Sequence, residues 1–155
     1  MRKTRRWWKA GWTVALLLGW GAAAPELRAD LKAALAEKDL GRRSKLALDN
    51  AEAALQAARS AYRDGDLEKT KAAIQEIQES VELAYQSLND THKNPRSSPR
   101  WFKNAEAATR DLLRRLDTFD HDMDYQDRPM LKPLEEKVQK VQDDLLLGLM
   151  EGKPK

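Results

Sequence analysis

The sequence contains no cysteine, only two histidines and seven glycines in 155 residues, and aromatic residues make up just 6% of it. Without cysteine the chain can form no disulfide framework, zinc-thiolate site, c-type haem attachment or lipoprotein anchor. The glycines form no phosphate-binding loop, and no Ser, Thr or Lys stands in a nucleophile motif. We therefore expect a protein that is not an enzyme and holds no cofactor.

The residues that are abundant favour helix, because Ala, Leu, Glu, Lys, Arg and Gln dominate the chain. Its net charge of +3 is unevenly distributed. Residues 1–24 hold five of the 28 basic residues and no acidic one, so the rest of the chain carries 23 basic and 25 acidic residues. A nucleic-acid-binding surface needs concentrated positive charge. The interspersed charges after residue 24 therefore predict no nucleic-acid partner.

Residues 1–24 have the order of a secretory signal peptide. A basic start up to Lys9 is followed by an apolar run over 11–21 and by three small residues, Ala22 to Ala24. The apolar run is short for a membrane span, which needs about 20 residues. We expect an exported protein, periplasmic or extracellular, whose domain covers residues 25–155.

An uncleaved signal anchor is the alternative, because Pro25 directly follows Ala24 and hinders cleavage there. In that case Trp7, Trp8 and Trp12 suit the membrane interface. Contact with the inner membrane is expected only through residues 1–24.

Apolar residues after residue 24 recur at intervals of three and four, which predicts amphipathic helices. The clearest pattern is Leu67, Thr70, Ile74, Ile77, Val81, Ala84 and Leu88. The expected helices cover about 26–38, 40–63, 67–89 and 100–123, followed by a last helix that Gly152 ends. No strand pattern occurs. The predicted fold is all-α, an antiparallel four- to five-helix bundle of the up-down kind.

Several polar residues and glycines fit the ends of these helices. Asp39 and Asp66 are suitable N-caps, and Gly65 suits the left-handed position after a helix. Ser98 is expected to cap the helix that starts with Pro99, and Asp127 the last helix.

The stretch from Ala61 to Lys69 reads AYRDGDLEK. It resembles the turn between the two helices of a tetratricopeptide repeat, and the resemblance extends over one hairpin, residues 44–89. Thr70 stands where that pattern usually has Ala, the helices are longer than those of the repeat, and no second copy follows. The alternative, which we favour here, is an ordinary helical hairpin with good capping residues. The resemblance implies binding of a peptide or protein.

Asp120, His121, Asp122 and Asp124 are the densest group of potential metal ligands. Three of the acids match the first ligand spacings of an EF-hand loop, but Tyr125 occupies the glycine position and Leu131 the position of the bidentate Glu. We therefore predict a solvated acidic linker, with weak metal capture as the alternative.

The candidate binding residues lie at the start of the fourth helix. They are Arg96, Arg100, Trp101 and Phe102, with Lys103 beside them, and Trp101 is the one tryptophan after residue 24. An aromatic residue among cations at a junction of loop and helix is a common binding anchor. The alternative, which we favour here, is that Trp101 and Phe102 cap one end of the core while the cations extend over it.

The sequence thus predicts an exported interaction or structural module that binds another envelope protein or a peptide through a helical face or residues 94–103. A periplasmic four-helix carrier of a small ligand or metal is one alternative. A membrane-tethered helper protein, with the signal uncleaved, is the other.

Overall fold

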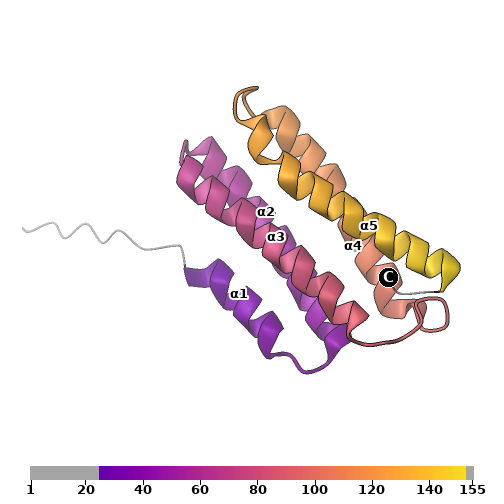
Figure 1. Cartoon of the computed structure of the whole chain (residues 1–155). Coiled ribbons are helices and arrows are strands. Elements are labelled where there is room, and N and C mark those ends of the chain that lie inside the picture. Colours follow the sequence, from indigo (N-terminus) through magenta and orange to yellow (C-terminus); the bar gives the residue numbers. More distant parts are fainter. Residues whose placement is uncertain (1–24, 153–155) are drawn as a thin grey trace, which may run out of the picture.

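The computed structural model describes residues 25–152, and their side chains from Leu31 onward (Figure 1). The expected signal segment therefore lies outside the described residues. The described part is helical and contains no strand, which confirms the all-α bundle. None of its helices combines the length and the apolar character needed to cross a membrane. The elements are α1 (Pro25–Ala36), α2 (Leu40–Arg63), α3 (Leu67–Asn89), α4 (Pro99–Asp122), the 3₁₀ turn η1 (Arg128–Met130) and α5 (Lys132–Glu151).

Helices α2 and α3 form a hairpin whose ends are set by local side chains. The Asp39 carboxylate accepts a hydrogen bond from the Arg42 N–H, and the Asp66 carboxylate accepts one from the Lys69 N–H. Gly65 has a φ of +75°, the left-handed conformation that glycine adopts without strain. The predicted caps and turn are confirmed, and α2 and α3 have the predicted bounds.

The α2–α3 hairpin is the most closely packed pair of helices in the structure. Small side chains line the contact and let the two backbones approach, among them Ala47, Ala51, Ala54 and Ala58 of α2 and Thr70, Ala73, Ser80 and Ala84 of α3. A polar contact also lies inside it. The Asn50 Nδ2 donates to the Ser80 hydroxyl at 2.8 Å and to the Glu76 carboxylate at 3.1 Å.

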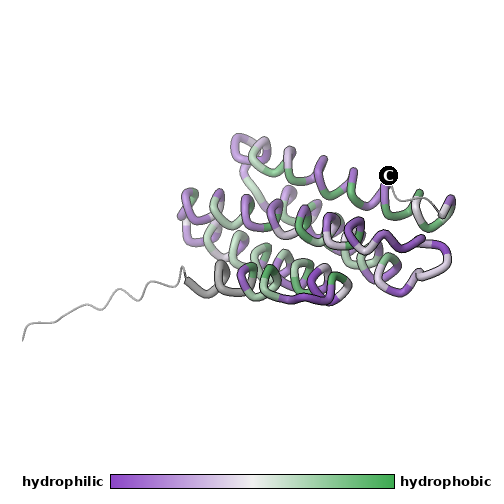
Figure 2. The backbone as a smooth tube through the Cα atoms, turned by 60° about the horizontal axis from the view of Figure 1, so that its bottom comes forward, coloured by the Kyte–Doolittle hydropathy of each residue, from purple (hydrophilic) through white to green (hydrophobic). Residues whose placement is uncertain are grey.

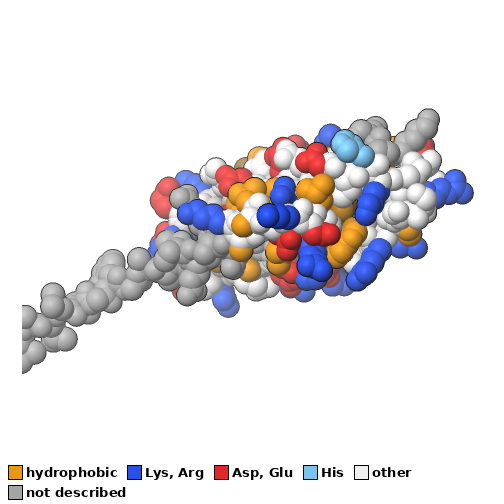
Figure 3. All heavy atoms as spheres, turned by 90° about the horizontal axis from the view of Figure 1, so that it is seen from below, with side chains coloured by type: hydrophobic (Ala, Val, Ile, Leu, Met, Phe, Trp, Pro, Cys, Tyr) orange, Lys and Arg blue, Asp and Glu red, His pale blue; other side chains and the backbone are white. Residues whose placement is uncertain are grey.

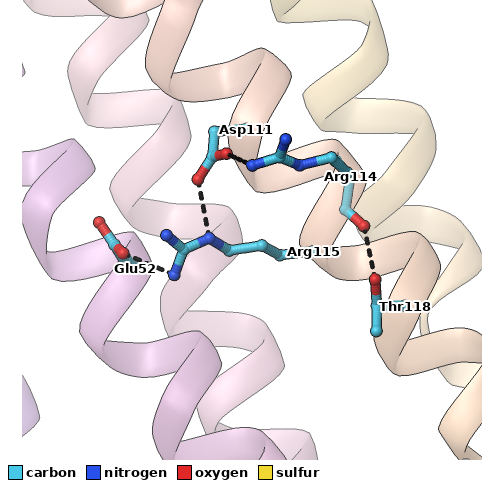
Figure 4. A network of polar contacts seen from close by, with 5 residues as sticks. All are labelled: Glu52, Asp111, Arg114, Arg115 and Thr118. Carbon is cyan, nitrogen blue, oxygen red and sulfur yellow. Dashed lines mark hydrogen bonds and ion pairs between the residues drawn. The ribbon is translucent and has the colours of Figure 1, made fainter.

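Helices α4 and α5 form a second hairpin, which lies against the first (Figure 1). Packing is antiparallel within each hairpin, and α2 and α4 run parallel, as the alternating directions of an up-down bundle require. Two ion pairs show this. Glu52 reaches Arg115 at 2.7 Å (Figure 4), and further along both helices Arg59 reaches Asp122 at 2.6 Å. Residues 90–98 cross the end of the bundle, so α4 packs more on α2 than on α3. α-Solenoids are likewise built from stacked helix pairs.

The core lies between the two hairpins, and the helices turn apolar residues towards it and polar ones outward (Figure 2). The second hairpin contributes larger side chains than the first. They include Phe102, Leu112, Leu116 and Phe119 of α4 and Leu134, Val138, Val141 and Leu145 of α5.

Helix α1 packs on the outside of α2, so the bundle has four principal helices and a short fifth. Ala34 is fully buried in this contact, whereas Leu35 is 54% exposed. The connection to α2 is fixed by Arg43, whose Nε donates to the Glu37 carbonyl at 2.9 Å.

Of two further predicted caps, one was wrong and the other is confirmed in its position only. Asp127 does not cap the last helix, because the 3₁₀ turn η1 intervenes and Leu131 precedes α5. Ser98 occupies the N-cap position of α4, but its side chain makes no capping hydrogen bond. Gly152, with a φ of +77°, ends α5 as predicted.

Candidate binding pocket beside Trp101

The segment that joins α3 to α4 is a series of tight turns held by its own side chains. The Thr91 hydroxyl donates to the Leu88 carbonyl at 2.7 Å, and the Asn94 Oδ1 accepts from the Arg96 N–H at 2.8 Å. Pro95 is buried beneath it. These contacts give α4 a defined starting point across the end of the bundle.

Trp101 lies in the first turn of α4 and packs against the start of α2. Its indole lies over Gly41, where a Cβ would come within 2.5 Å of the ring atom Cε2. Gly41 is buried, whereas Trp101 keeps part of its surface exposed. The absence of a side chain at position 41 therefore fixes the indole at the edge of the core without hiding it.

A pocket of about 330 Å³ lies beside Trp101. It is lined by Leu88 at the end of α3, by Thr91 and Lys93, and by residues 98–103. Most of its exposed wall is apolar. We call this hollow the Trp101 pocket. Its volume is at the lower end of the range that is usual for ligand sites, about 300–1,000 Å³.

The charged side chains around the Trp101 pocket are basic. Lys93, Arg100 and Lys103 line it, and no acidic residue occurs between Asp90 and Glu106. Among the described residues, none of these three cations forms an ion pair within 4.0 Å. Further along α4 the cations are paired, since Arg110 contacts Glu106 and both Arg114 and Arg115 contact Asp111. Figure 3, seen from the side of α1 and the α3–α4 segment, shows Lys and Arg, Asp and Glu, and apolar side chains interspersed on this face.

The structure brings together three of the four predicted binding residues. Arg100 and Trp101 contact each other, with the guanidinium carbon 5.1 Å from the ring centroid, and Phe102 adjoins the same pocket. Phe102 itself is only 3% exposed, so it belongs mainly to the core. Arg96 lies apart, beside Gly152 at the end of α5.

Sequence reasoning missed Gly41, Leu88 and Lys93 as parts of this site. Gly41 and Leu88 come from other helices, and their proximity to Trp101 is visible only in three dimensions. The sequence does contain a signal for Lys93, because this residue belongs to the run without acidic residues between Asp90 and Glu106.

The acidic stretch from Asp120 to Asp127, at the opposite end of α4, is held by ion pairs and hydrogen bonds to neighbouring residues. Asp122 pairs with Arg59, and Asp120 lies 4.0 Å from Arg128. The carbonyl of Asp117, which lies 2.7 Å from the His121 Nδ1, together with the carboxylate of Asp117, raises the pKa of His121. In the part of the chain that the structure describes, no three His, Cys, Asp or Glu side chains are grouped to hold a metal.

The Asp124 backbone is tied to α2. Its N–H donates to the Tyr62 hydroxyl at 2.9 Å, and that hydroxyl donates to the Asp127 carboxylate at 3.0 Å. This stretch thus holds the α4–α5 connection against the first hairpin.

Comparison with models of known protein families and with curated proteins finds no match to this chain.

Proposed function

We propose that the protein is an exported, non-enzymatic interaction module that binds a peptide or a peptide segment of another envelope protein in the Trp101 pocket. One observation carries the proposal. An apolar hollow of about 330 Å³ is bordered by Lys93, Arg100 and Lys103, and these cations have no carboxylate partner in the described chain.

The arrangement of the pocket supports binding rather than catalysis. The lining residues offer apolar surface and positive charge, and they include no carboxylate, histidine or thiol that would serve as a general base or nucleophile. A second hollow, of about 350 Å³ between α3 and α5, has Lys71 as its one charged lining residue, and Lys71 pairs with Glu68 at 3.0 Å. Unpaired charge therefore distinguishes the Trp101 pocket.

Fluorescence polarisation of the purified full-length protein against a labelled peptide library tests the proposal. The library should contain peptides that bind the wild-type protein but bind neither the Trp101→Ala nor the Lys103→Glu variant. Tyr125→Ala is the matched control, because Tyr125 is an 85% exposed aromatic residue in the segment after the other end of α4. If no peptide binds, or if Tyr125→Ala weakens binding as much as Trp101→Ala, the proposal is wrong.

A further inference from the structure

The Trp101 pocket places its positive charge and its apolar wall on the same short piece of chain. Residues 99–103 supply both the cations Arg100 and Lys103 and the apolar groups of Pro99, Trp101 and Phe102. Lys93 adds its charge from the preceding segment. A ligand that satisfies this site must carry a negative charge within a few bonds of an apolar group.

The size of the pocket limits how large that apolar group can be. A volume of about 330 Å³ lies near the bottom of the usual range for ligand sites and accommodates one or two side chains rather than a long acyl chain. Leu88 and Phe102 are both buried, at 0% and 3% exposure, so the apolar wall is backed by the rigid core. The site is therefore preformed for a short apolar group.

The start of α4 is electropositive as well. The backbone N–H groups in the first turn of a helix have no partner within the helix. Here the Ser98 side chain supplies no capping bond to them. The aligned peptide dipoles add partial positive charge at this end. These groups strengthen the positive potential that the three unpaired side chains already create at the pocket.

We infer that the Trp101 pocket recognises the free C-terminus of a peptide that ends in an apolar residue. In such a terminus the carboxylate and the side chain are attached to the same carbon, which matches a site whose cations and apolar wall are adjacent. The apolar side chain enters beside Leu88 and Phe102, and the carboxylate meets Lys93, Arg100 and Lys103. Capture of terminal carboxylates by basic and backbone donor groups is a known mode of peptide recognition. The inference rests on the proposed function and names its ligand class.

The test compares matched peptides on the full-length protein by fluorescence polarisation. One peptide ends in leucine with a free carboxylate, the second has the same sequence with a C-terminal amide, and the third ends in lysine with a free carboxylate. The first should bind about tenfold or more tightly than either of the others, because charge-assisted hydrogen bonds are lost with the amide. Added salt should weaken its binding.

Charge reversal then locates the carboxylate. Lys93→Glu and Lys103→Glu should weaken binding of the free acid about tenfold and leave binding of the amide nearly unchanged. Lys132→Glu is the matched control, because Lys132 is an exposed cation at the start of α5, at the other end of the bundle. It should change neither affinity.

The outcomes separate the inference from the proposed function. If acid and amide bind equally, or if peptides with an internal acidic residue bind as well as the free terminus, the inference is wrong while the interaction module stands. If no peptide binds, both are wrong.

Discussion

The indole of Trp101 occupies the space that a side chain at Gly41 would need. A Cβ at position 41 would lie 2.5 Å from the ring atom Cε2, closer than real Cβ contacts allow. The two residues begin α4 and α2, so their contact sets how the two hairpins meet at this end of the bundle. The same contact holds the indole at the mouth of the candidate pocket.

Gly41→Ala should therefore destabilise the protein, although the same change at an open helical position stabilises by up to about 1 kcal/mol. Overpacking against the rigid ring should lower the free energy of unfolding by about 1–3 kcal/mol, measured by urea denaturation. In a Trp101→Ala background the ring is absent, and Gly41→Ala should become neutral or stabilising. A destabilisation of equal size in both backgrounds would show that the indole is not the obstacle.

A second relationship joins the α4–α5 connection to α2 through the Tyr62 hydroxyl, which bonds both Asp124 and Asp127. Tyr62→Phe removes these bonds but keeps the edge-on packing of the ring on Phe119, whose centroid lies 5.9 Å away. The free energy of unfolding should fall by about 1–2 kcal/mol, and amide exchange at Asp124 should accelerate.

Tyr125→Phe is the control for this prediction, because the Tyr125 side chain is 85% exposed. It should leave stability unchanged. Equal effects of the two substitutions would contradict the role of Tyr62.

Local chemistry explains which parts of the fold were predictable from sequence. Asp39, Gly65 and Asp66 act on neighbouring backbone groups, so the bounds of α2 and α3 followed from residues that are adjacent in the chain. The 3₁₀ turn at Arg128–Met130 carries no comparable cap, and the start of α5 was misjudged there.

Features that depend on contacts between helices were not predictable in the same way. Trp101 and Phe102 were both expected to cap one end of the core, but only Phe102 is buried in it, while Trp101 packs against it partly exposed. The direction in which α4 enters the bundle decides between such neighbours, and that direction depends on Gly41 in another helix. That α4 packs more on α2 than on α3 was missed for the same reason, since periodicity describes the faces of a helix but not its partners.

The buried contact of Asn50 with Glu76 and Ser80 gives a third prediction. Asn50 is 2% exposed and its amide is the donor to both partners. Asn50→Ala leaves Glu76 and Ser80 without that donor, which should cost about 1–3 kcal/mol of unfolding free energy. Thermal unfolding followed by circular dichroism measures the effect.

At neutral pH, Asn50→Asp should lower the free energy of unfolding more than Asn50→Ala does, because it places a second carboxylate against Glu76. Like charges raise the pKa of such a pair, so stability should recover as the pH falls and one carboxylate is protonated. Asn104→Asp, on the exposed surface of α4, controls for the added charge. If Asn50→Asp shows no recovery in acid, the two side chains do not face each other as described.

Glu135 in the first turn of α5 gives the last prediction, which concerns pH. Burial raises the pKa of Glu135 above its ordinary value of 4.5, and the carboxylates of Asp120 and Asp117 raise it further. The folded state thus holds the proton more tightly than the unfolded chain, and this contribution to stability is lost as the pH rises through the folded pKa. Glu135→Gln removes the ionisable group, so the variant should melt at a higher temperature than wild type at pH 7, and this advantage should shrink to nothing below about pH 4.

Glu136→Gln removes the same charge from an exposed neighbouring position and should give no such pH-dependent difference. Melting curves of the three proteins between about pH 4 and pH 7 test this prediction. If Glu135→Gln is less stable than wild type at pH 7, the charged form of Glu135 is stabilised in the fold and the prediction is wrong.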